Sequence, residues 1–349
     1  MEEFNYQAEQ SEVPRQWFPF SRMGTFYSCI LVGMNLIAVI IGAIWGFWMV
    51  VNETISKGGA VDFDMLTKNL SDILTNNMAW IMLIAYAITI PLCMLIARTV
   101  PKYQDEQKEK WKISKLLLFL MLSIGLMMIG NFVSQIMQGV VSLITGHKMT
   151  NPLDSILNDN NILGSIVLVA IIAPFVEEFL FRKVLIDRVR VYGDKVTMVL
   201  SGVLFGLFHG NLFQVVYAML LGMLLAYVYL KTSNIWYCIG LHMVINIIGG
   251  VLPLLLLHGV DMKVIQSMQV DKVMQAAPRV AGLGALVLIE ISCMIATIVI
   301  LAKFWKSIVL KPATIEIDKG NRFKTIYLNA GTIIFFVICI FVFITNAMA

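Results

Sequence analysis

Long apolar stretches separated by short polar connections run through the whole chain. Each is close to the length, about 20 residues, with which an α-helix crosses a hydrocarbon layer about 30 Å thick. A membrane strand would instead alternate apolar and polar residues over about ten positions. The pattern therefore predicts an all-α, polytopic transmembrane helix bundle of eight to nine spans. The nine apolar stretches are 25–51, 78–97, 116–144, 162–185, 196–210, 212–230, 235–257, 281–302 and 327–348.

The order of these stretches and of their polar residues suggests four regions. Residues 1–24 form a polar cytoplasmic tail, and 25–160 hold the N-terminal transmembrane helices. Residues 161–257 carry the ionisable groups discussed below and form the expected core of the protein. Residues 258–349 hold the C-terminal transmembrane helices.

Composition and charge add a location and an orientation. Hydrophobic residues make up 59% of the chain and charged residues 14%, against about 45–50% and about 25% in soluble domains. This excludes a water-soluble core and indicates a multi-pass membrane protein. Most of the 26 Lys and Arg residues fall on one side of the predicted spans. The positive-inside rule then predicts a cytoplasmic N-terminus and an outer C-terminus. The net charge of +4 fits attraction to anionic lipid, and no nucleic-acid motif is present.

A cluster of charges interrupts the apolar stretch 162–185. Glu177, Glu178 and Arg182 follow Pro174 there. Ionisable groups at membrane depth cost several kcal/mol each, so such a cluster indicates a functional site. On a helix, Glu178 and Arg182 share a face, whereas Glu177 points elsewhere. We therefore predict a structural ion pair between Glu178 and Arg182, which leaves Glu177 free to act as a general base. The alternative is an interfacial charge cluster that ends a helix.

Two later apolar stretches contain further polar groups. Phe205 precedes His209 by one turn, and His242 precedes Asn246 by one turn. A single intramembrane histidine can also be only a hydrogen-bonded link between helices. Glu290, in the stretch 281–302, is a lone carboxylate that either is protonated and hydrogen-bonded between helices or lines a substrate path.

These three elements resemble, in order and spacing, the three motifs of the CPBP family. They are the Glu177, Glu178 and Arg182 set, the Phe205 and His209 pair, and the His242 and Asn246 pair. This family contains CAAX-type prenyl endopeptidases and bacterial proteins tied to bacteriocin maturation and self-immunity, and is also called the abortive-infection family. The resemblance covers about residues 162–250, whereas the flanking helices carry no family signature.

The resemblance implies intramembrane hydrolysis of a peptide bond in a membrane-associated peptide or protein. Glu177 and His209 would activate a water molecule, and His242 and Asn246 would form an oxyanion hole, without a cofactor. A zinc-dependent version remains open, because Glu177, His209 and His242 are a possible ligand set with an open position for water. A non-catalytic role as a self-immunity protein or a membrane scaffold is the second alternative.

Residue counting leaves one difficulty for this site. Glu177 and His242 lie about 9–11 Å from the predicted cytoplasmic boundary, whereas His209 lies nominally near the opposite side. To meet them, the helix that carries His209 must begin late, or the turn at Gly210 and Asn211 must lie inside the protein. We expect the site to open toward the cytoplasm.

Overall fold

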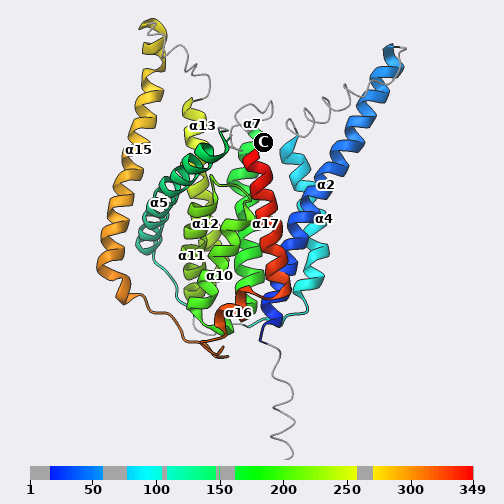
Figure 1. Ribbon diagram of the computed structural model, residues 1–349. Coiled ribbons are helices and arrows are strands. Elements are labelled where there is room, and N and C mark those ends of the chain that lie inside the picture. The colour runs from blue at the N-terminus through cyan, green and yellow to red at the C-terminus, as the bar shows by residue number, and fades with distance from the viewer. Residues whose placement is uncertain are drawn as a thin grey trace, which may run out of the picture.

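The described part of the protein is a bundle of helices (Figure 1). The computed structural model describes residues 16–57, 77–103, 108–146, 149, 162–257 and 270–348. These residues contain helices and no strand, which confirms the predicted all-α fold. Residues 1–15 of the predicted tail lie outside them. The longer helices are α2 (Phe18–Lys57), α4 (Met78–Ala97), α5 (Ile113–Thr145), α10 (Asp194–Phe208), α11 (Val215–Thr232), α12 (Ile235–Asn246), α15 (Val270–Phe304) and α17 (Ala330–Met348).

Shorter elements complete the bundle, and three of them are π-helical. A continuous helical stretch is built from α7 (Ile162–Val167), η1 (Leu168–Ile172), α8 (Ala173–Glu178), η2 (Phe179–Ile186) and α9 (Asp187–Val189), where η1 and η2 are π-helices. The 3-10 turn η3 (Arg190–Tyr192) follows. A third π-helix, η4 (Ile247–Val251), joins α12 to α13 (Leu252–Leu257). The 3-10 turn η5 (Trp305–Ser307) and α16 (Arg322–Tyr327) lie between α15 and α17.

The number of spans is slightly lower than predicted. Seven helical stretches of the described residues are long and apolar enough to cross a membrane, and a shorter apolar helix covers Ala330–Asn346. Of the nine predicted stretches, 327–348 corresponds to this shorter helix, and 196–210 corresponds to α10. It has 15 residues and is therefore about 22 Å long, less than the hydrocarbon layer requires.

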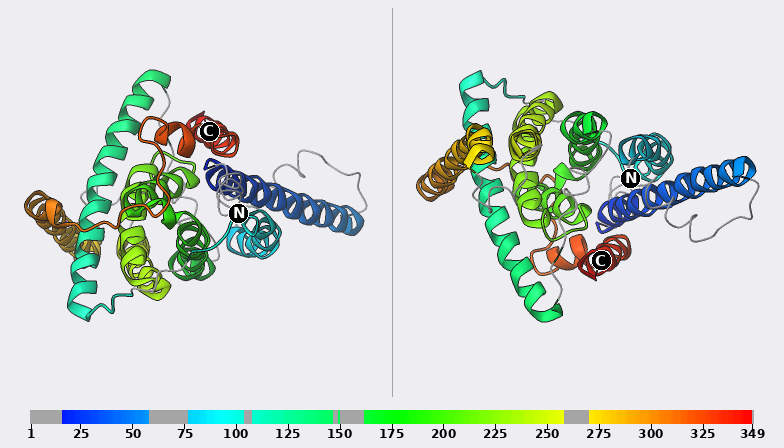
Figure 2. Two further views of the ribbon diagram at one scale, coloured as in Figure 1. Left: turned by 90° about the horizontal axis from the view of Figure 1, so that it is seen from below. Right: turned by 90° about the horizontal axis from the view of Figure 1, so that it is seen from above.

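The helices that carry the polar motifs lie in the middle of the bundle. Helices α10 and α11 pack along each other, α5 packs across α11 and α12, and α15 lies outside α5. On the opposite side, α2 packs against α4 and α17 (Figures 1 and 2). Many large apolar side chains on α2, α5, α15 and α17 face outward, as expected of surfaces in contact with lipid.

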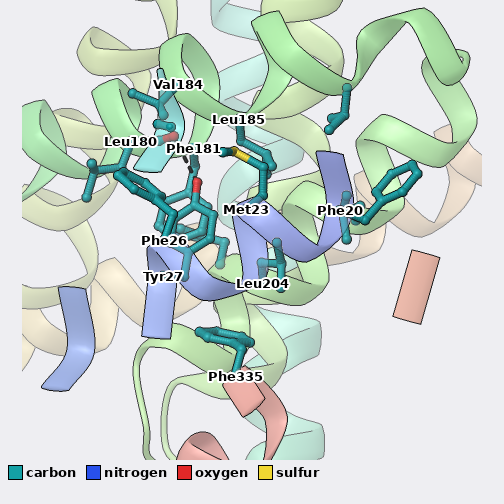
Figure 3. Packing of buried hydrophobic residues seen from close by; sticks show 14 of the residues in the cluster. Phe20, Met23, Phe26, Tyr27, Leu180, Phe181, Val184, Leu185, Leu204 and Phe335 are labelled. Carbon is teal, nitrogen blue, oxygen red and sulfur yellow. Dashed lines mark hydrogen bonds between the residues drawn. The ribbon is translucent and has the colours of Figure 1, made fainter. Parts of the chain in front are cut away.

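The first helix packs directly against the core region. Tyr27 on α2 stacks on Phe181 of η2 with ring centroids 4.7 Å apart, and its hydroxyl donates a hydrogen bond of 2.9 Å to the Leu180 carbonyl. Phe335 on α17 meets the other side of the same cluster, with its ring centroid 6.1 Å from that of Tyr27 (Figure 3). The predicted flanking regions therefore share one hydrophobic core with the motif-bearing helices. Helix α2 also begins at Phe18, earlier than the predicted boundary at residue 24.

Several charges counted toward the orientation are buried in the protein. Arg188 is buried and donates hydrogen bonds to the carbonyls of Ala97 and Val184, at 2.7 and 2.8 Å. Lys231 is buried beside Asp194, with 3.4 Å between Nζ and Oδ2. Such residues are fixed by their partners, so the orientation prediction rests on the remaining basic residues of these connections. The bundle places the start of α2 and the end of α17 at opposite ends (Figure 1).

Candidate functional site

The Glu178 carboxylate lies at the centre of the candidate site. Arg182 donates from Nε to Glu178 Oε2 at 2.7 Å and from Nη2 to Oε1 at 3.3 Å. Both side chains are 0% exposed. The Arg182 Nη1 also donates to Ser201 Oγ on α10 at 2.6 Å. The predicted ion pair is therefore present, and it links the stretch 162–189 to α10.

His242 on α12 joins this pair from a third helix. Its Nδ1 lies 2.9 Å from Glu178 Oε1, and its Nε2 lies 3.8 Å from Glu177 Oε2. A carboxylate can only accept, so Nδ1 carries the proton in this contact. The ring of His242 thus lies between the two adjacent carboxylates, and Glu178 fixes its orientation.

Glu177 differs from Glu178 in what it contacts. Its side chain is 14% exposed. Among the described residues, its ion-pair contact is the 3.8 Å approach of His242 Nε2 to Oε2. The carboxylate is also close enough to the phenols of Tyr86 and Tyr217 to interact with them electrostatically. Glu177 therefore retains accessible oxygens for a further partner, whereas the Glu178 oxygens are occupied.

Helix α10 places His209 beside the same cluster through the ring of Phe205. That ring lies edge to face with His209 and with His242, at centroid distances of 4.9 and 5.7 Å, and the Arg182 guanidinium lies 5.4 Å from its centroid. His209 Nδ1 is 2.8 Å from the Phe205 carbonyl. Nδ1 therefore donates and Nε2 remains available. Within the described chain, His209 has no hydrogen bond or ion pair with Glu177.

The turn after His209 explains how this residue reaches the site. Helix α10 begins at Asp194, so it does not begin late. Gly210 adopts a φ of +64°, and Asn211 is buried with its Oδ1 accepting from the Gln214 amide at 2.9 Å. The Gly210 carbonyl accepts from Asn346 of α17 at 2.8 Å. Of the two expectations, the turn buried in protein is therefore the one observed.

Helix α10 approaches α11 closely. A Cβ added to Gly206 would lie 2.5 Å from the Val215 carbonyl oxygen, and one added to Gly202 would collide with Met223. Small residues at this crossing let the two backbones approach. This packing fixes the position of the Phe205 and His209 side chains.

Asn246 has a structural partner that the sequence did not suggest. The Ala173 amide donates to the Leu168 carbonyl in the π-helical pattern of η1. The next carbonyl, Val169, would then pair with residue 174, which is a proline without an N–H. Asn246 Nδ2 donates to this Val169 carbonyl at 2.9 Å. One N–H of the amide group remains for another acceptor.

The predicted site residues are thus only partly brought together. Glu177, Glu178, Arg182 and His242 form one contiguous cluster, while His209 joins it through Phe205. Glu290 is buried on α15, which packs on α5 at the edge of the bundle (Figure 1). No group of three or more His, Cys, Asp and Glu side chains in the described ranges is placed to hold a metal ion.

Sequence reasoning missed Ser201, which holds the end of the Arg182 guanidinium. A signal for it was available, because Ser201 precedes His209 by eight residues, close to two full turns, and therefore lies near the same face of one helix.

Comparison with known proteins supports the resemblance. Residues 159–248 match the family model described as type II CAAX prenyl endopeptidase Rce1-like. A Bacillus subtilis (strain 168) protein named "Putative membrane peptidase YdiL" is 26% identical over 174 residues, which cover 47% of this chain and 67% of the relative. No solved structure matches. The predicted CPBP resemblance is confirmed over this segment, and these findings support a membrane protease of the CAAX prenyl endopeptidase kind.

We expect Arg182→Ala to destabilise the protein by about 3–5 kcal/mol, because it leaves the Glu178 carboxylate buried with one partner fewer. The matched control is Lys183→Ala on the next position. Lys183 pairs with Asp187 at 3.1 Å, but its side chain is 46% exposed, so its loss should cost about 1 kcal/mol or less. Unfolding curves in detergent would measure both changes. Equal stability of the two variants would contradict a structural role for Arg182.

We further expect Asn246→Leu to destabilise the protein by about 1–3 kcal/mol, because the Val169 carbonyl then loses its partner. In a Pro174→Ala background residue 174 regains an N–H, so the cost of Asn246→Leu should become smaller. Unfolding of the two single variants and the double variant would measure this coupling. Costs that simply add would show that Pro174 does not create the need for Asn246.

Proposed function

We propose that this protein is an intramembrane endopeptidase that hydrolyses a peptide bond of a membrane-associated peptide or protein. The supporting observation is that two adjacent carboxylates differ in how far their oxygens are occupied by partners. Glu178 is occupied by Arg182 and His242, whereas Glu177 keeps accessible oxygens next to the same imidazole. A general base needs accessible oxygens, as Glu177 has, and a fixed group nearby that can share charge with it. The Rce1-like match over residues 159–248 supports the same reaction class.

In the proposed reaction, Glu177 and His209 activate one water molecule. The water oxygen attacks the carbonyl carbon of the peptide bond while its proton passes to Glu177. His209 is suited to assist, since its Nε2 is free while Nδ1 is held by the Phe205 carbonyl. The C–N bond then breaks, and the proton is delivered to the leaving amine. The products are a carboxylate and an amine, and the base returns to its starting state.

His242 and Asn246 are assigned to stabilise the negative oxygen of the tetrahedral intermediate. Asn246 can offer its second amide N–H, since the first is used on Val169. Because His242 Nδ1 donates to Glu178, Nε2 can donate only from the doubly protonated ring. The Glu178 carboxylate would balance that positive charge. Each well-placed donor of this kind contributes about 3–4 kcal/mol to transition-state stabilisation.

The proposal places the protein in a bacterial plasma membrane, as its Bacillus subtilis relative suggests. Its partners would be the lipid bilayer and a membrane-associated substrate. We favour catalysis without a metal. The reason is that water activation by Glu177 and His209 and an oxyanion hole of His242 and Asn246 give each of these four residues a role without one.

We expect Glu177→Gln and His209→Ala each to lower peptide cleavage by at least about 100-fold, the range for loss of a general acid or base. The variants should keep the unfolding temperature of the wild type, because neither side chain forms the Glu178 and Arg182 pair. Glu290→Gln is the matched control, since it removes a membrane carboxylate outside the site. Turnover of fluorogenic peptides by the purified proteins would be measured. Full activity of Glu177→Gln would refute the assignment and favour a self-immunity or scaffold role.

We expect turnover to survive exhaustive dialysis of the purified protein against a chelator. Elemental analysis should then find no zinc in a one-to-one ratio with active protein. The physical reason is that water activation is assigned to Glu177 and His209 rather than to a Lewis acid. Loss of activity with recovery on adding zinc would instead establish the zinc-dependent version with Glu177, His209 and His242 as ligands.

A further inference from the structure

A cavity of about 400 Å³ lies beside the candidate oxyanion residue Asn246. Its polar lining consists of Asn131, Gln135 and Gln138 on α5, Gln214 and Tyr217 at the start of α11, and Asn246 itself. Five of these six side chains are carboxamides. An amide side chain both donates and accepts hydrogen bonds and carries no net charge. The cavity is therefore lined for a neutral ligand that also both donates and accepts.

The three carboxamides of α5 are the informative part of this lining. Asn131, Gln135 and Gln138 are spaced four and three residues apart, so they lie on one face of the helix. Among the described residues they have no hydrogen-bond partner. By contrast, Gln214 donates to the Tyr217 hydroxyl at 2.9 Å, and Asn246 donates to Val169. Polar groups at membrane depth are unfavourable without partners, so this face of α5 must meet water or a ligand.

The cavity lies on a definite side of the catalytic cluster. It is bounded by the second half of α5, by the turn that joins α10 to α11, and by Gly249 and Gly250 of η4. Each of these segments lies farther along its helix from the basic connections, such as 108–115, than His242 lies along α12. With the N-terminus in the cytoplasm, this is the outer side.

We propose that this cavity binds an extended, unprenylated segment of polypeptide that enters from the outer side of the membrane. The inference rests on the proposed function and names its substrate class. An extended backbone presents free N–H and C=O groups, which the carboxamides can pair with, whereas a helix has already paired its own. An isoprenoid chain offers no such groups and would leave the amides of α5 without partners. No atom lies within 4 Å of a Cβ added to Gly250, so a backbone has room to approach there.

The opening can be tested without any enzymatic assay. Gln138→Cys should react with a membrane-impermeant sulfonated maleimide added to intact cells, because water reaches it from outside. The matched control is Phe132→Cys on the same helix, where the side chain is 65% exposed and faces away from the cavity. It should remain unlabelled, as should the wild type, whose five cysteines are buried or partly buried. Labelling of Gln138→Cys only in inverted vesicles, or equal labelling of Phe132→Cys, would overturn the outer opening.

The ligand class can be tested in the same system with Glu177→Gln present, so that bound peptide is not cleaved. Unfolded casein, an unprenylated polypeptide, should slow labelling of Gln138→Cys about fivefold when it occupies the site four-fifths of the time. A farnesylated tetrapeptide should not protect it. Protection by the farnesylated peptide alone would overturn the proposed ligand. A labelling rate that neither peptide changes would also overturn the proposed ligand, because the cavity would then serve only as a path for water.

Failure of this inference can be told apart from failure of the proposed function. If casein protects Gln138→Cys and the wild type cleaves no peptide, the cavity inference holds and the hydrolytic function is wrong. If the wild type cleaves peptides in a Glu177-dependent way while Gln138→Cys is neither reached from outside nor protected, hydrolysis holds and this inference is wrong.

Discussion

The rest of the site depends on the buried contact between Glu178 and Arg182. A carboxylate and a guanidinium, each 0% exposed, are tolerable in this location only because each satisfies the other. The pair then contacts two further helices, through Ser201 on α10 and His242 on α12. Phe205 lies between the Arg182 guanidinium and the two histidine rings. The positions of His242 and Phe205 therefore depend on this charge pair.

The sequence predicted the features that depend on residue spacing within a single helix. Spacing along a single helix predicted the pairing of Glu178 with Arg182. It could not show which carboxylate His242 would contact, because that depends on how α12 rotates against α8. It also could not show that Asn246 would cap Val169. The Val169 carbonyl lacks a backbone partner because the turn there is π-helical. A helical period of 3.6 residues does not predict a π-helical turn.

Counting depth along the chain was reliable only for straight, fully spanning helices. Helix α10 is 15 residues long, and the turn that follows it is buried against Asn346 of α17. A depth counted from Lys195 at a constant rise assumes that the helix crosses the layer. A helix of 15 residues does not meet this assumption, so the count could not place His209 beside the other site residues. The carboxamides of α5 were visible in the sequence as polar residues on one helical face, but their shared cavity with Asn246 required the fold.

Each polar group at membrane depth can be judged by whether its hydrogen-bonding capacity is used within the protein. Glu178, Arg182 and the Val169 carbonyl are satisfied internally, so they specify structure. Among the described residues, Glu177 has one long ion-pair contact, and the carboxamides Asn131, Gln135 and Gln138 have no hydrogen-bond partner. Asn246 belongs to both groups, because one amide N–H is used and one remains. It lies between the carboxylate cluster and the amide-lined cavity, which is the position expected of a residue that contacts the scissile carbonyl while the cavity holds the adjoining backbone.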